Sequence, residues 1–159
     1  MKLMYLADRL SIQRHLWPIS GGPYASMKNG PVLSDPYNII TEQEDWTVSN
    51  GTWGRLLKNS VYPDIELARA FEARALSQAN LESLEQVQID FAHMTTPQLI
   101  DFVHSLPEWE DPGDSSVPIP PRRLLRHFGL NDEQIREIGR EVLSFASEEV
   151  TFRACRDRA

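Results

Sequence analysis

The apolar side chains of the first seventeen residues recur every three or four positions, which predicts an amphipathic helix. Met4, Tyr5 and Ile12 add a second apolar side, as expected for a helix buried in a bundle. Prolines and two adjacent glycines at 18–23 end the helix. Asp8 lies one turn from Met4 and from Ile12, so it is either buried with a partner or faces solvent. The positions with helical spacing are Leu3, Leu6, Ala7, Leu10 and Trp17.

Two short segments follow this turn. The stretch 24–28 fits either an extended strand or a single helical turn, and Asn-Gly-Pro at 29–31 is a second turn signal. A short helix is predicted from about residue 31 or 32 to Ile40. Pro36 fits inside it only if Ser34 or Asp35 caps a helix that has Pro36 in its first turn.

The clearest β pattern lies at 46–53, Trp-Thr-Val-Ser-Asn-Gly-Thr-Trp. Asn-Gly between β-forming residues is the preferred two-residue hairpin turn, and it places Val48 opposite Trp53. Two strands alone are marginally stable, so a third strand or a helix must pack against them. Residues 65–67 fit that third strand, whereas the alanines around them also fit a helix over 64–76.

The second half of the chain is predicted to be helical. Ser77 is the expected N-cap of a helix that reaches about Ala92. Thr96 followed by Pro97 predicts the start of the next helix, which stops near Pro107.

A polar loop with four prolines is expected over 108–121, followed by a short helix over 122–128. Asn131 and Gln134 form a capping-box pattern for a last helix. The predicted fold class is therefore mainly α (α+β), with a small antiparallel β-hairpin or sheet around residues 46–57. We expect a single domain over 1–152 and a flexible basic tail over 153–159.

Composition supports an ordinary globular chain. It has 159 residues, of which 41% are hydrophobic and 25% are charged. No stretch is long and apolar enough to span a membrane, and the N-terminus lacks the pattern of a signal peptide. A single cysteine, Cys155, cannot form an internal disulfide, so we expect a cytoplasmic protein. Sixteen basic and twenty-three acidic residues give a net charge of −7, which suits a basic partner and disfavours nucleic acid.

Sequence motifs for catalysis are scarce. There is no Gly-rich phosphate loop, and the four histidines lack the spacing of a metal site. Residues 122–128 and the last helix have the outline of a helix-turn-helix. The last helix carries the carboxylates Asp132, Glu133, Glu137 and Glu141, however, and these oppose docking against phosphates.

Three features of the sequence lie near residue 108. His104, near a helix end, has either a structural role or a functional contact. Trp109 either plugs the edge of the core or anchors a partner. Glu108, Glu110 and Asp111 form an acidic group on a proline-broken loop, where solvated side chains are the simplest expectation.

An ordered set of short motifs runs through residues 1–130. Each motif alone is weakly specific, whereas the ordered set is more specific. The set consists of Leu3-Met4-Tyr5-Leu6-Ala7-Asp8-Arg9, Pro18-Ile19, Tyr24, Met27, Gly30-Pro31-Val32, Tyr37, Leu76-Ser77, Leu99, His104, Pro107, Trp109 and Ile119. In this order the motifs resemble the Panacea domain, the SocA-like antitoxins of bacteria and their phages.

The resemblance implies a mostly helical fold with a small antiparallel β element. It also implies that the protein neutralises a cognate toxin encoded beside it, by direct protein contact. Family members usually have a further helical segment before the motif that begins here at Leu3. Because the given sequence starts at that motif, we expect Leu3, Tyr5 and Leu6 to be partly exposed, which favours a homo-oligomer or partner capture. The motif positions expected to be structural are Tyr5, Asp8, Gly30, Pro31 and Val32.

We thus expect a binding protein that has no catalytic residue, metal or cofactor. An aromatic anchor ringed by acidic side chains would suit a basic toxin surface. One alternative is a proteolysis adaptor that delivers the toxin to a cellular protease. Another is an enzyme acting on a small molecule or peptide through Asp8 and His104. The expected partner contacts are Tyr24, Met27, Tyr37, His104, Glu108, Trp109, Glu110 and Asp111.

Overall fold

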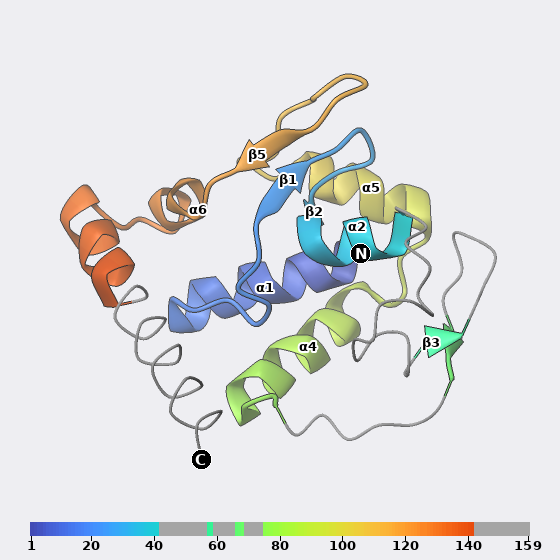
Figure 1. Cartoon of the computed structure of the whole chain (residues 1–159), viewed down its shortest axis with the longest axis horizontal. Coiled ribbons are helices and arrows are strands. Elements are labelled where there is room, and N and C mark those ends of the chain that lie inside the picture. Colours follow the sequence, from blue (N-terminus) through green and yellow to red (C-terminus); the bar gives the residue numbers. More distant parts are fainter. Residues whose placement is uncertain (42–56, 59–65, 69–74, 142–159) are drawn as a thin grey trace, which may run out of the picture.

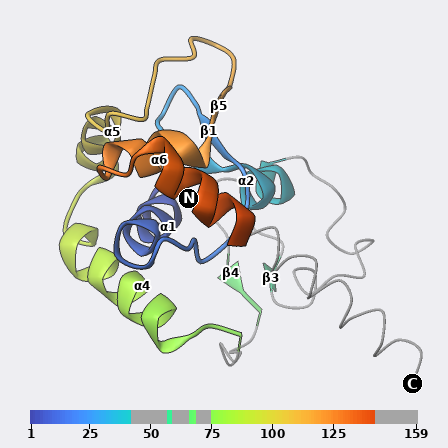
Figure 2. The same ribbon diagram turned by 90° about the vertical axis from the view of Figure 1, so that its left-hand side faces the viewer.

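Two helices far apart in the sequence, α1 (Lys2–His15) and α4 (Gln78–Phe91), pack against each other (Figure 1). The computed structural model describes residues 1–41, 57–58, 66–68 and 75–141. Helix α1 also contacts the sheet and the helices α5 (Thr96–His104) and α6 (Pro121–His127), which surround it in Figure 2. The fold class is mainly α with a small antiparallel sheet, as predicted, although the three-stranded sheet lies outside the predicted region at 46–57.

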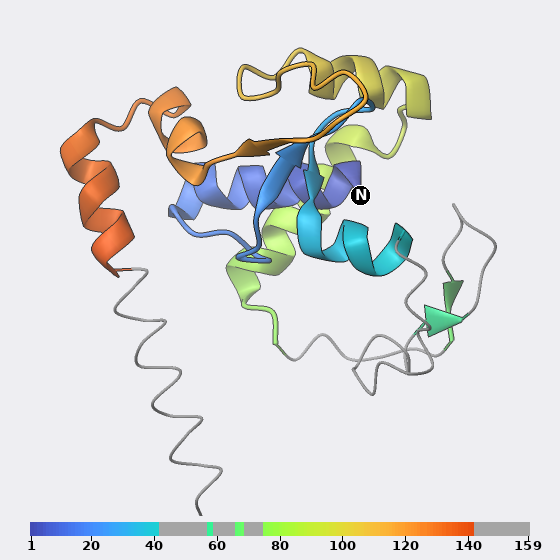
Figure 3. The same ribbon diagram turned by 45° about the horizontal axis from the view of Figure 1, so that its top comes forward.

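The sheet has three short strands, β1 (Tyr24–Ser26), β2 (Val32–Leu33) and β5 (Val117–Ile119). Strand β1 is central, and Tyr24 pairs with Leu33 on one side and with Ile119 on the other. Figure 3 shows the strands lying across α1. The open choice for residues 24–28 is thus decided in favour of a strand at 24–26.

The prediction that the short helix includes Val32 and Leu33 is wrong. These residues form β2, and the helix α2 runs over Ser34–Thr41. Pro36 lies in the first turn of α2, as the capping argument requires, because a proline is tolerated there. Pairing with Tyr24–Ala25 holds Val32–Leu33 extended, and no local pattern reports that contact.

The structure also places a strand at Glu66–Leu67 (β4), which pairs antiparallel with Leu57–Lys58 (β3). The strand alternative for 65–67 is confirmed at these two residues, and a helix over 64–76 is wrong there. The predicted hairpin at 46–53 and the tail at 153–159 lie outside the described residues.

The helix starts follow local capping. The side chain of Ser77 accepts a hydrogen bond from Asn80 N (3.2 Å), which confirms the predicted cap of α4. Helix α5 begins one residue earlier than predicted, because Thr95 is its N-cap and donates its N–H to Gln98 Oε1 (2.9 Å). Residues 132–141 form a further helix with the predicted capping box, in which Asn131 Oδ1 accepts from Gln134 N (3.0 Å).

The core lies between α1, α4, α5, α6 and the sheet, and it includes residues of α1 that we expected at the surface. Tyr5 is completely buried and Leu6 is 5% exposed, so the expectation of partial exposure is wrong for both. Leu3 and Met4 remain 36% exposed. Other core residues are Ala7, Ile12, Tyr24, Leu33, Val87, Val103, Ile119, Leu124 and Leu125.

Candidate functional site

A buried carboxylate, Glu108, joins the loop after α5 to α1. Its Oε1 accepts hydrogen bonds from Tyr5 Oη (2.9 Å) and from Arg9 Nε (2.7 Å). Glu108 has no exposed surface, and the Arg9 side chain is only 16% exposed. The expectation that Glu108 is a solvated loop residue in contact with a partner is therefore corrected. The arginine supplies the counter-charge that a buried carboxylate needs.

A second buried carboxylate, Asp8, holds the turn after α1. Its Oδ1 accepts from the backbone N–H groups of Ile19 (3.2 Å) and Ser20 (3.0 Å). Its Oδ2 accepts from Ser20 Oγ and from Tyr24 Oη (3.0 Å). Asp8 is 2% exposed, so of the two alternatives left open by the sequence, the buried one with partners is correct.

Both networks depend on neutral phenols as donors. Burial raises the pKa of Tyr5 far above its ordinary value, and the charge and hydrogen bond of Glu108 raise it further. Burial likewise raises the pKa of Tyr24, with the Asp8 carboxylate as the next cause. An ionised phenol would repel the carboxylate it contacts, so both side chains stay protonated at neutral pH. Tyr24 is 3% exposed, and its expected role as a partner contact is corrected to a core role.

Gly30 occupies a position that no larger residue fits. Its φ is +101°, and a Cβ added there would lie 2.4 Å from Val103 Cγ2. Its carbonyl accepts a hydrogen bond from Lys2 Nζ (3.2 Å), and burial lowers the pKa of Lys2 to about 8. Pro31 and Val32 are buried beside it. In the structure, the five motif residues expected to be structural are all buried.

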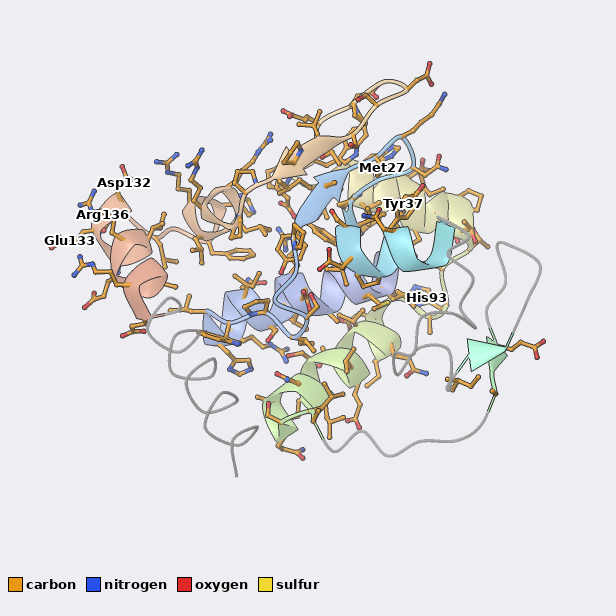
Figure 4. All side chains as sticks on the ribbon, in the orientation of Figure 1. Met27, Tyr37, His93, Asp132, Glu133 and Arg136 are labelled. Carbon is orange, nitrogen blue, oxygen red and sulfur yellow. The ribbon has the colours of Figure 1, made fainter. Side chains whose placement is uncertain are left out.

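Three of the expected contact residues meet at the surface near the end of α5. The Trp109 ring stacks on His104 with centroids 4.0 Å apart and planes at 14°. Trp109 Nε1 donates to the backbone carbonyl of Met27 (3.2 Å), which lies in the loop after β1 (Figure 4). All three are half-buried, so Trp109 lies at the edge of the core and is not fully covered.

The acidic side chains that follow Trp109 are exposed. Glu110 accepts from Arg123 Nη1 (3.2 Å), and its backbone N–H donates to Ser26 Oγ (3.3 Å). Asp111 is exposed and accepts from the N–H of Gly113 (2.9 Å). We call Met27, His104, Trp109, Glu110 and Asp111 the Trp109 surface. Tyr37 is half-buried on α2 and is drawn with Met27 in Figure 4.

The sequence did not indicate the polar partners of Glu108, Asp8 and Glu110, which are Arg9, Ser20 and Ser26. Arg9 shares a helix face with Tyr5, which is a detectable signal, although its partner Glu108 lies 99 positions away. Ser20 and Ser26 sit in short segments and carried no signal at all. Arg9 and Ser26 hold the backbone on either side of Trp109, at residues 108 and 110, whereas Ser20 holds the turn after α1.

Asp8 and His104, the pair required by the enzyme alternative, have separate surroundings. The hydrogen bonds of Asp8 go to Ile19, Ser20 and Tyr24, whereas His104 stacks on Trp109. Among the described residues, no group of three or more His, Cys, Asp or Glu side chains is arranged to hold a metal ion. No helix in this part of the chain is long and apolar enough to cross a membrane.

Comparison with known families decides the relationship. The family model described as "Antitoxin SocA-like, Panacea domain" matches residues 1–110. The chain belongs to this family. The Panacea match contains both buried networks, Gly30 and Trp109, and it confirms the resemblance read from the motifs. A search of the curated proteins and a search of the solved structures each gave no significant match.

Proposed function

We propose that this Panacea protein is an antitoxin that neutralises a cognate toxin by direct protein–protein binding, without chemistry of its own. The family match over residues 1–110 carries the proposal, because that family is antitoxin-like. The toxin would be the product of an adjacent gene, and both proteins would act in the cytoplasm.

The Trp109 surface is the contact that we propose for the toxin. A half-buried tryptophan that is already held by stacking and by its Nε1 hydrogen bond loses little freedom on binding. Tryptophan anchors are frequent among residues that dominate binding energy. Asp111 adds an exposed negative charge beside it, which complements a basic toxin surface. Tyr37 is a further candidate, while Tyr24 and Glu108 act only by supporting the fold.

The alternatives receive less support. An enzyme needs its catalytic groups at one reacting atom, whereas the donors that enclose Asp8 do not include His104, which stacks on Trp109. Nucleic-acid binding is opposed by Asp132 and Glu133, which Figure 4 shows with Arg136 on the last described helix. A role as a proteolysis adaptor would use the same toxin contact and add a cellular protease as partner.

Co-expression with the product of the adjacent gene tests the proposal. We expect that gene alone to stop growth, and this chain to restore growth and to co-purify with the product at fixed stoichiometry. Restored growth with disappearance of the toxin, prevented by deleting a cellular protease, would replace simple inhibition by the adaptor alternative. No rescue, or a harmless neighbouring gene, would refute the antitoxin function.

A further inference from the structure

A cleft of about 180 Å³ opens between α1 and α4, beside α5. Its lining is mostly apolar, with Leu10, Val87, Phe91 and Phe102 inside and with the exposed side chains of Gln13 and Asp90 at the rim. None of the residues of the Trp109 surface lines it.

The size of the cleft limits what it can hold. Pockets for drug-sized ligands and cofactors are about 300–1,000 Å³, so this one is too small for such a molecule. An apolar cavity of about 150 Å³ in another protein accommodates benzene. The cleft therefore matches one large apolar side chain, such as a leucine or phenylalanine of a partner.

The exposed positions of α4 carry unbalanced negative charge. The helix has Glu82, Glu85 and Asp90 and no lysine or arginine. Among the described residues no cation forms an ion pair with these three carboxylates; two of them accept only from glutamines of the same helix.

The neighbouring groups leave that charge uncompensated and add apolar surface. Arg9, the cation that lines the cleft, is paired with Glu108 and lies over the Phe128 ring at 5.0 Å. It is therefore not available to neutralise Asp90. Ile89, next to Asp90, is 74% exposed. The cleft has the Asp90 carboxylate at its rim, and the same helix carries an exposed isoleucine and two further carboxylates without an ion pair to a described residue. This combination is complementary to a cationic amphipathic segment.

We infer that the cleft between α1 and α4, with the adjoining face of α4, binds a cationic amphipathic segment of a partner polypeptide. One large apolar side chain of that segment occupies the cleft, and its lysines or arginines lie against Asp90 and the glutamates of α4. This inference is independent of the antitoxin proposal, because it uses a different face of the molecule and a different set of residues.

Two synthetic peptides of identical leucine, lysine and alanine content test the inference. One places its leucines on a single helical face, and the other has the same residues in scrambled order. Binding to the full chain is measured by fluorescence anisotropy. Asp90→Lys reverses the charge at the rim, and Gln13→Trp fills the mouth of the cleft. Glu141→Lys is the matched control, since it changes the net charge equally from an exposed helical position.

We expect the amphipathic peptide to bind the unaltered chain more tightly than the scrambled peptide. Asp90→Lys and Gln13→Trp should each weaken it by about tenfold, and Glu141→Lys by less than about twofold. Circular dichroism verifies that each variant is folded. Equal weakening by Asp90→Lys and Glu141→Lys would show attraction by net charge alone and overturn the inference. Equal affinity for both peptides, absence of binding, or no effect of Gln13→Trp would overturn it as well.

Discussion

Tyr5 donates a hydrogen bond of 2.9 Å to Glu108 across 103 positions of the chain. Both side chains are completely buried, and Arg9 completes the contact from the next turn of α1. The loop that carries Trp109 is thereby fixed to the first helix. The surface proposed for the toxin thus depends on a polar contact in the core.

Removing the charge of Glu108 should destabilise the fold strongly. In Glu108→Gln, the guanidinium of Arg9 stays largely buried and loses its counter-charge. We expect a loss of about 3 kcal/mol in the free energy of unfolding, as for other broken buried pairs. Urea denaturation followed by circular dichroism measures this.

Glu110→Gln is the matched control, two residues along the same loop. Its carboxylate is exposed and pairs with Arg123 at 3.2 Å, so the change should cost less than about 1 kcal/mol. Similar losses for the two variants would contradict the role assigned to the Tyr5–Glu108–Arg9 contact.

Gly30→Ala should be among the most damaging single-methyl changes in the chain. The new Cβ would lie 2.4 Å from Val103 Cγ2, at a φ of +101° that side chains rarely adopt. We expect a loss of about 2–5 kcal/mol from strain and overpacking together. Thermal unfolding measures the loss.

Gly113→Ala separates the two causes. Gly113 has a φ of +61° and open space around it, so only backbone strain of about 1 kcal/mol is expected. Combining Gly30→Ala with Val103→Ala should cost less than the sum of the two changes, because the truncated valine leaves room. Strict additivity would argue against the close approach.

Alkaline conditions should unfold the protein through its buried phenols. The pKa of Tyr5 and of Tyr24 is raised in the folded state, so above about pH 10 the unfolded chain releases protons that the folded chain retains. The contribution of the neutral phenols is complete below that pH. It is lost as pH rises, by up to about 1.4 kcal/mol per pH unit for each tyrosine.

Lys2 acts in the opposite direction at lower pH. Its pKa of about 8 means that the folded state loses this proton first, so its contribution to stability rises between about pH 8 and pH 10.5. The free energy of unfolding is therefore compared between about pH 10.5 and pH 11.5. Tyr24→Phe should make the decline shallower, and an unchanged slope would contradict the assignment.

The proposed toxin contact predicts a charge effect at Asp111. Asp111→Lys should weaken the affinity for the toxin by about tenfold, because it places a cation beside Trp109, which we propose to contact a basic toxin surface. Glu137→Lys, an equal charge change on the last described helix, is the control and should have little effect. Affinity is measured by titration calorimetry. Equal effects would move the contact away from the Trp109 surface.

Local signals allowed much of the helical structure to be predicted. The Ser77 cap and the Asn131–Gln134 capping box involve side chains within three residues of the backbone groups they bind, so the sequence alone contains the whole interaction. The predicted start of α5 is one residue late, because Thr95 and Thr96 are both suitable caps. The side chain of Gln98 accepts from the backbone N–H of Thr95, which makes Thr95 the N-cap.

Long-range contacts explain what the sequence did not predict. Val32 and Leu33 are strand residues only because β1 pairs with them. Glu108 stands among prolines and acids, as a solvated residue would, and it is buried because of partners about a hundred positions away. The sequence does not decide whether Asp8 is buried or faces solvent for the same reason, since its partners Ser20 and Tyr24 come from segments whose path the sequence does not predict.

The central strand β1 has one neighbour, β5, that lies beyond the residues matched by the family model. A chain cut after residue 110 would leave the backbone of Tyr24–Ser26 without that neighbour and would remove Ile119 and Leu124 from the interior. Such a free edge invites pairing with another molecule. The boundary of sequence similarity is therefore a poor guide to where this protein can be shortened, and a fragment ending there should precipitate rather than fold.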